Sequence, residues 1–267
     1  MPPRAKFYIV AITIMLTGCS HMRAPGLPVA DSIVTDRLVI YSDFDVPQKD
    51  QLVAKLEALR SQVTSDLQLA DASERIHIYL FKTPKRYQAF MQKHFDQYPN
   101  RRALFIETDD KLNVYAHWGD RVAEDLRHEV CHGYLHAGLA HLPLWLDEGL
   151  AEYYEVDDSR QGINAENLAS LRDAAADAGW VPDLERLERL KTIDDMDHLD
   201  YAEAWAWVHF LLQTTSERRE LLLQYLQTTQ RHRPPTSLSD AIRRADRDVA
   251  RLLKTHVNDL DRGTNAQ

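Results

Sequence analysis

Two histidines and a glutamate stand at a spacing that suits metal-dependent hydrolysis. The chain contains the pentapeptide HEVCH, in which His128 and His132 are four residues apart and Glu129 follows the first histidine. On an α-helix, residues four apart lie on one face, with Cβ atoms about 6 Å apart, so both imidazoles can reach one metal ion. The motif therefore predicts a site for one Zn²⁺ ion, with Glu129 as the general base that acts on a water molecule.

A catalytic zinc ion usually takes three protein ligands, so a third must come from elsewhere in the chain. His136 is a poor candidate, because three residues at successive intervals of four span about 12 Å of helix axis. His141 follows in the predicted connecting loop and stays an alternative. Glu148 is the preferred ligand, because a second helix that packs antiparallel after a short loop would carry its carboxylate back to the histidines.

The residues around these ligands carry further expectations. Glu152 lies one turn beyond Glu148 on the same face, and we expect its carboxylate to accept the N–H of a liganded histidine. Asp147 lies about 100° around the helix from Glu148 and is expected to point elsewhere. Cys131, inside the motif, is expected to be a small buried residue rather than a ligand.

The motif and the segment around Glu148 together resemble a known family. Fifteen residues separate His132 from Glu148, which stands within WLDEGLAEY. This pattern is similar to the gluzincins, zinc metallopeptidases of the thermolysin and aminopeptidase type, and to the compact bacterial peptidase-MA-like proteins. The resemblance covers about residues 120–215 and implies a zincin-like fold with Glu148 as the third zinc ligand. The metzincin pattern is excluded, because Leu135 and Gly138 stand where it requires glycine and histidine.

The same resemblance singles out an aromatic-rich segment over 200–211. In aminopeptidase-like gluzincins, a tyrosine at the start of such a helix stabilises the tetrahedral intermediate, and Tyr201 matches that place. His209 is the alternative donor. The Gly-x-Met-Glu-Asn segment that aminopeptidases use near the substrate amino group is not found, so the resemblance extends to peptide-bond hydrolysis but not to aminopeptidase specificity.

Two classes of function fit these residues. The first is a zinc-dependent peptidase that acts on a peptide or protein substrate. The second is a lipid-anchored binding or scaffold lipoprotein whose zinc site is structural or inactive, which a closed site with a fourth ligand such as His141 would favour. Hydrolysis of a non-peptide amide would use the same groups. The net charge of −9 argues against a nucleic-acid partner.

The start of the chain predicts export. A short basic region with Arg4 and Lys6 precedes an apolar run over 7–16, too short to span a membrane, and the run ends in LTGC. This pattern resembles the lipobox of bacterial lipoproteins, in which the chain is cut before the cysteine and that cysteine, here Cys19, is lipidated. By the same resemblance, Ser20 is compatible with sorting to the outer membrane, where the protein would face the periplasm. In a cell with one membrane, the anchor would lie on the outer face of the plasma membrane.

Hydrophobic periodicity predicts an α+β fold for the remainder. A small mixed or antiparallel sheet with helices comes first, and a mostly helical half that carries the HEVCH helix follows. The expected parts are a signal peptide over 1–18, a tether over 19–35, the sheet-bearing part over 36–119, the helical zinc-binding part over 120–260 and a flexible tail over 261–267.

Individual elements follow from the same pattern. The strands over 103–108 and 112–117 are expected to form a hairpin whose edge could bind an extended peptide. The other strands are expected over 38–44 and 75–81, and helices over 48–69, 84–95, 120–137, 144–156, 165–178, 183–190, 200–213, 216–229 and 238–258.

Overall fold

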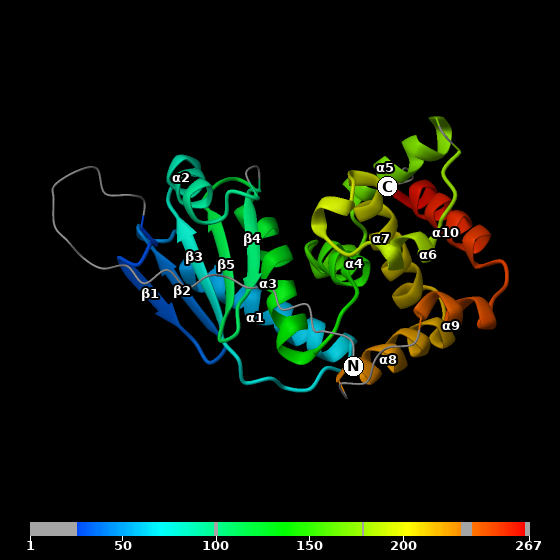
Figure 1. Cartoon of the computed structure of the whole chain (residues 1–267), viewed down its shortest axis with the longest axis horizontal. Coiled ribbons are helices and arrows are strands. Elements are labelled where there is room, and N and C mark those ends of the chain that lie inside the picture. Colours follow the sequence, from blue (N-terminus) through cyan, green and yellow to red (C-terminus); the bar gives the residue numbers. More distant parts are fainter. Residues whose placement is uncertain (1–25, 99–100, 178, 231–236, 265–267) are drawn as a thin grey trace.

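The computed structural model describes residues 26–98, 101–177, 179–230 and 237–264. In these residues, a sheet-bearing N-terminal half is followed by a mostly helical C-terminal half (Figure 1). The expected α+β fold is confirmed. The predicted signal peptide and Cys19 lie outside the described residues. Within those residues, no helix is both long and apolar enough to cross a membrane.

The sheet is mixed and has five strands in the order β1-β2-β3-β5-β4. The three central strands β2, β3 and β5 run parallel, whereas β1 and β4 pair antiparallel at the two edges. β4 and β5 form the expected hairpin. The strands are β1 (Asp31–Val34), β2 (Leu38–Ser42), β3 (Ile76–Phe81), β4 (Ala103–Glu107) and β5 (Leu112–His117).

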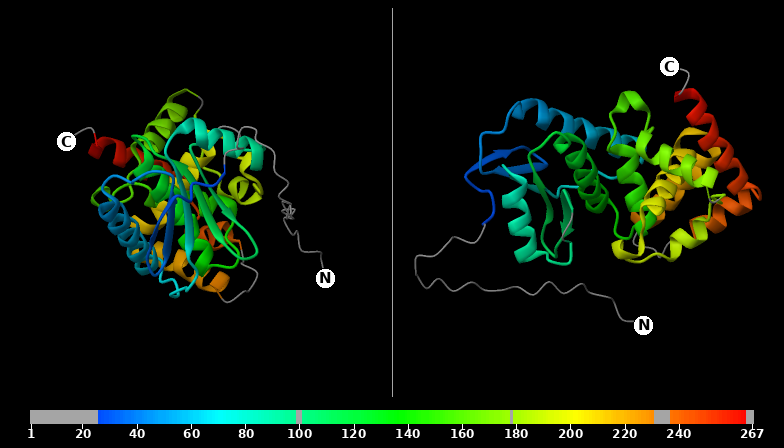
Figure 2. Two further views of the ribbon diagram at one scale, coloured as in Figure 1. Left: turned by 90° about the vertical axis from the view of Figure 1, so that its left-hand side faces the viewer. Right: turned by 90° about the horizontal axis from the view of Figure 1, so that it is seen from above.

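Alternating side chains give the sheet two apolar faces. Ile76, Ile78 and Leu80 of β3 belong to the large core under α1 (Lys49–Asp66) and α3 (Val122–Gly138). Tyr79 and Phe81 point to the other face, where they pack with α2 (Pro84–His94). As a result, α1 and α3 lie between the sheet and the helical half (Figures 1 and 2).

The helical half shares one continuous core with the sheet. Val114 of β5, Trp145 of α4 and Trp205 of α7 belong to the same cluster of buried residues. The boundary between the sheet-bearing part and the helical part, near residue 120, therefore does not divide the core. The helices are α4 (Leu144–Tyr154), α5 (Ala165–Asp177), α6 (Leu184–Arg189), α7 (His198–Gln213), α8 (Ser216–Gln230), α9 (Leu238–Ala245) and α10 (Val249–Thr264), with short 3₁₀ turns η1 (Asp158–Arg160) and η2 (Ile193–Asp195).

Three expectations about elements differ from the structure. β1 lies within the predicted tether, and its four mostly exposed residues carry no apolar alternation that would reveal an edge strand. The single helix expected over 238–258 is two helices, because the Asp246 side chain accepts a hydrogen bond from the backbone N–H of Asp248 (3.1 Å) and breaks the chain direction. α10 also continues to Thr264, into the predicted flexible tail, because it packs on α5 and α7.

The contact between α4 and α7 in the site region depends on a glycine. α4 crosses α7 at Gly149, where a Cβ atom would lie 2.6 Å from the carbonyl oxygen of Ala204. Real Cβ atoms do not approach a backbone oxygen so closely, so any larger residue would push the two helices apart. The neighbouring Glu148 would move with α4.

We expect Gly149→Ala to lower the free energy of unfolding by about 1–3 kcal/mol, through overpacking against α7. Urea denaturation of the metal-free protein measures this change. Gly26→Ala is the matched control, because no atom lies within 4 Å of a Cβ at that position, and its effect should stay within about 0.5 kcal/mol. Equal stability of the two variants would contradict this expectation and show that α4 and α7 accommodate the added methyl group without loss of stability.

Candidate metal centre and active site

α3 brings the two histidines of the HEVCH motif together as predicted. The Nε2 atoms of His128 and His132 are 3.3 Å apart. α3 lies close to the sheet because Gly133 leaves room for it: a Cβ at that position would lie 2.6 Å from the Cδ1 atom of Ile76. His132 is buried and His128 is nearly so, with 15% of its side chain exposed. Both rings are therefore held by packing.

α4 supplies the third candidate ligand, Glu148. Its Oε2 atom lies 3.5 Å from Nε2 of His128 and 3.7 Å from Nε2 of His132. Ligand atoms in a tetrahedral zinc site, each about 2.0–2.1 Å from the ion, would be about 3.3 Å from one another. The three measured separations are close to this value. Together the three residues form a buried group that could hold a metal ion.

An arginine on α3 fixes the direction of α4. The Arg127 guanidinium donates hydrogen bonds to the carbonyl oxygens of Tyr154 (2.8 Å), Glu155 (3.0 Å) and Val156 (2.8 Å), at the C-terminal end of α4. A cation at this end satisfies free carbonyl groups and interacts favourably with the helix dipole. Because the start of α3 meets the end of α4, the two helices run antiparallel, as expected from the short loop.

Each histidine is oriented by a carboxylate at its other ring nitrogen. Nδ1 of His128 lies 3.0 Å from Oε2 of Glu155, and Nδ1 of His132 lies 2.8 Å from Oδ1 of Asp147. A proton on each Nδ1 would satisfy these contacts and leave both Nε2 atoms free to bind a metal. The expectation that Asp147 points elsewhere is therefore wrong.

Glu152 does not take the role expected of it. Its Oε2 atom accepts hydrogen bonds from the side-chain amides of Asn164 (3.1 Å) and Asn167 (2.8 Å), while Glu155 contacts the histidine. Asn164 also donates to Glu155 (2.6 Å), so it links the two carboxylates. Glu152 thus supports Glu155 instead of contacting a ligand directly.

The geometry of an imidazole ring explains why Asp147 is involved. The two ring nitrogens face different directions, so a metal at one and a carboxylate at the other approach from different sides. Asp147 and Glu148 are neighbours about 100° apart on α4, and His132 lies between them. Consecutive residues can therefore contact opposite edges of one ring.

A chain of hydrogen bonds continues from Asp147 to the sheet. Oδ2 of Asp147 lies 2.9 Å from Nε2 of His136, whose Nδ1 lies 2.6 Å from Oε2 of Glu107 at the end of β4. His132, His136 and Asp147 also form a group compact enough for a metal ion, as do His128, Glu152 and Glu155. Both ring nitrogens of His136 are already matched by carboxylates, however, so this ring serves as a link between α4 and β4.

Two other residues considered from the sequence take no part in the His128–His132–Glu148 group. His141 is exposed in the loop before α4, and the structure does not include it in a metal-binding group of the described residues. Cys131 is buried as a free thiol, as expected, and burial raises its pKa. Neither completes a closed site with four ligands.

The side chain of Glu129 extends from α3 to the edge strand β4. Its Oε2 atom accepts a hydrogen bond from the backbone N–H of Phe105 on β4 (2.7 Å). Burial raises the pKa of Glu129, and the two neighbouring histidines partly oppose this shift. The carboxylate is thus held beside the metal-binding group, where a general base must lie.

Tyr201, at the start of α7, also lies beside this group. Burial raises the pKa of its hydroxyl, the charge of Glu148 raises it further, and Arg101 lowers it. The Arg101 guanidinium donates a hydrogen bond to the Tyr201 hydroxyl (3.2 Å). Arg101 was not recognised from the sequence, because nothing in the segment before β4 distinguishes it from an ordinary surface arginine.

His209 lies away from this group, two turns further along α7. Its Nδ1 atom lies 2.9 Å from Nε2 of His256 on α10, and its ring packs near Tyr153 and Trp205. Burial and the nearby His256 lower the pKa of His209 to about 3. Of the two residues considered from the sequence, Tyr201 therefore lies beside the metal-binding group and His209 does not.

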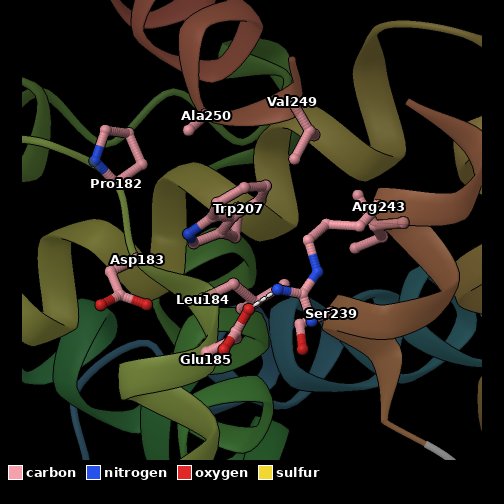
Figure 3. A pocket seen from close by; sticks show the side chains of 10 residues that line it. Pro182, Asp183, Leu184, Glu185, Trp207, Ser239, Arg243, Val249 and Ala250 are labelled. Carbon is pink, nitrogen blue, oxygen red and sulfur yellow. Dashed lines mark ion pairs between the residues drawn. The ribbon is translucent and has the colours of Figure 1, made fainter. Parts of the chain in front are cut away.

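A small cavity lies elsewhere in the helical half. It has a volume of about 110 Å³ between α6, α7, α9 and α10, with Trp207 and the Glu185–Arg243 ion pair in its wall (Figure 3). It contains no residue of the metal-binding group. Its size and lining indicate a packing gap near the start of α10.

Comparison with known proteins gives one family. A family model described as a protein of unknown function (DUF1570) matches residues 123–236. The matched part contains both histidines of the motif, Glu148 and Tyr201, but not the sheet. No curated protein matches the chain.

The carboxylates that orient the histidines should control metal affinity. We expect Asp147→Asn and Glu155→Gln each to weaken binding of Zn²⁺ by about 10–100-fold, because the ring nitrogens lose a charged hydrogen-bond acceptor. Competition with a chromophoric chelator measures the affinity. Glu152→Gln is the control from the same cluster and should have a clearly smaller effect. An effect of Glu152→Gln as large as that of Glu155→Gln would contradict the observed roles.

The His209–His256 pair should make stability depend on pH. The pKa of His209 is lower in the folded than in the unfolded chain, so its contribution is complete above about pH 6.5 and is lost as the pH falls toward 3. In the metal-free protein, the free energy of unfolding should decrease when the pH is lowered from 7.5 to 5. This decrease should be larger in the wild type than in His209→Gln, by on the order of 1–2 kcal/mol. Identical pH dependence in both proteins would contradict this account.

Proposed function

We propose that this protein is a zinc-dependent peptidase of the gluzincin type. The observation that carries the proposal is the spacing of three ligand atoms, from His128, His132 and Glu148, at 3.3 to 3.7 Å. This spacing fits three corners of a zinc tetrahedron and leaves one corner for a water molecule or a substrate. Two histidines and one carboxylate are also a usual ligand set for catalytic zinc.

The residues around the metal position have the chemistry that peptide hydrolysis needs. When bound, the metal ion would supply Lewis acidity, lowering the pKa of a water molecule and polarising the substrate carbonyl. Glu129 accepts the proton that the attacking water loses and then delivers it to the leaving amine. Tyr201 donates a hydrogen bond to the carbonyl oxygen as that oxygen gains negative charge.

The edge strand β4 offers a way to bind an extended peptide. The backbone N–H of Thr108 donates a hydrogen bond to the carbonyl of Lys111 across the hairpin. Along an antiparallel strand, successive N–H groups point alternately toward and away from the paired strand, so the N–H of Phe105 points away from β5. This N–H contacts Glu129. A peptide added along this edge would therefore pass directly beside the proposed base.

The alternative function is a lipid-anchored binding or scaffold lipoprotein with a structural or inactive zinc site. A structural zinc site is usually closed by four protein ligands. The metal-binding group has three, and His141, the fourth ligand considered, is exposed and outside it. This observation supports the catalytic proposal over the structural one.

We further propose that the activity lies outside the cytoplasm. The lipobox-like segment that ends at Cys19 implies cleavage of the signal peptide and a lipid anchor. Acyl chains supply membrane affinity, so no basic surface is required. The anchor would hold the peptidase at the outer membrane facing the periplasm, or on the outer face of the plasma membrane.

Removing the proposed base and the proposed oxyanion donor tests the mechanism. Peptide-library cleavage by the zinc-loaded protein should be abolished in Glu129→Gln, which keeps its zinc, and reduced about 10²–10³-fold in Tyr201→Phe. Glu220→Gln, on the exposed face of α8, is the control for loss of a carboxylate and should cleave normally. Full activity of Glu129→Gln would rule out this mechanism, and a zinc-loaded wild type that cleaves no peptide would favour the scaffold alternative.

A further inference from the structure

We propose that Arg101 binds a carboxylate group of the substrate beside Tyr201, so that the enzyme prefers peptides with a negative charge near the cleaved bond. This inference rests on the proposed peptidase function and names a substrate class for it. It concerns a residue outside both the HEVCH motif and the part of the chain that matches the family model.

The position of Arg101 places a positive charge beside Tyr201. Its guanidinium donates a hydrogen bond to the Tyr201 hydroxyl (3.2 Å). Burial lowers the pKa of Arg101, but the contact with Tyr201 and the charges of Glu148 and Glu129 raise it overall, so the guanidinium lies within electrostatic reach of the ligand and the proposed base. A substrate held between Glu129 and Tyr201 would therefore lie next to it.

Arg101 is half-buried without a carboxylate partner in the described part of the chain. Its one hydrogen bond there is to the neutral Tyr201 hydroxyl, and no carboxylate oxygen of the described residues lies within 4.0 Å of it. The next residue differs: Arg102 forms a two-pronged pair with Asp125 of α3 (3.0 and 2.8 Å). Arg101 therefore has no direct ion pair among the described residues, and a substrate carboxylate would supply one.

The chemistry of the guanidinium selects the class of ligand. Arginine presents five N–H donors in a planar fork that matches the two oxygens of a carboxylate. One donor of Arg101 is committed to Tyr201, so others are available to an anion. The Arg102–Asp125 pair anchors the adjacent residue to α3 and so fixes where this fork begins. Both a C-terminal carboxylate and an acidic side chain present the same two oxygens.

Three synthetic peptides separate these sources: acetyl-Ala-Ala-Glu-Ala-Ala-amide, its neutral Gln counterpart, and that Gln peptide with a free C-terminus. Their affinities are measured by calorimetry on the zinc-loaded, full-length Glu129→Gln protein, which does not turn them over. At least one carboxylate peptide should bind about 10–100-fold more tightly than the neutral peptide. The peptide that gains affinity identifies the source of the carboxylate.

The preference should disappear when Arg101→Gln is added and fall when Arg101→Lys is added, since lysine keeps the charge without the fork. The control variant Arg251→Gln, which removes an exposed arginine of α10, should retain the preference for carboxylate peptides. Equal binding of the three peptides, or no measurable binding of any, overturns the inference, and so does a preference that survives Arg101→Gln. Zinc content and peptide cleavage by the protein with Glu129 intact are measured separately, so loss of the proposed peptidase function is distinguishable from loss of carboxylate recognition.

Discussion

The hydrogen bonds at the Nδ1 atoms of His128 and His132 are the interactions on which the site depends. They turn both rings so that their Nε2 atoms meet at one point, 3.3 Å apart. The partner carboxylates, Glu155 and Asp147, both come from α4 or its end, the element that also carries Glu148. The relation of two helices, α3 and α4, therefore sets the whole ligand geometry. Arg127 joins α3 to the end of α4, and the close packing at Gly149 holds α4 against α7.

The sheet contributes the parts of the site that the helices cannot provide. The backbone N–H of Phe105 fixes Glu129, and Glu107 ends the hydrogen-bonded chain through His136. Arg101 reaches Tyr201 from the segment just before β4. The match to the family model covers residues 123–236 and so omits these contributions. The group that could hold a metal ion thus lies in the helical half, whereas the edge strand positions the proposed base.

Sequence reasoning was most successful where a feature is local and periodic. The HEVCH spacing requires a helix to work, and the antiparallel return of α4 places Glu148 where expected. Glu155 and Asp147 were missed because their roles depend on the direction of each imidazole, which helix periodicity does not fix. Arg101 could not be found either, since its neighbour Tyr201 is one hundred residues away in the chain. Edge strand β1 was missed because its pairing with β2, and not its own residue pattern, makes it a strand. The break before α10 was missed because it depends on one local hydrogen bond, from the backbone N–H of Asp248 to the Asp246 side chain.

The carboxylates of the site argue that a cation belongs to it. Glu129, Asp147, Glu148, Glu152 and Glu155 are all buried or half-buried within this small region. Burial and the neighbouring Glu155 raise the pKa of Glu152 to about 7, so this acid is only partly ionised near neutral pH. Buried carboxylates that repel one another disfavour the folded state unless protons or cations neutralise them. The histidines offer partial relief, but each can bind a metal through Nε2 only as a neutral ring. A divalent cation at the ligand group would supply the positive charge that offsets these carboxylates, and the guanidinium of Arg101, which has no direct ion pair among the described residues, would then be available to an anion from outside.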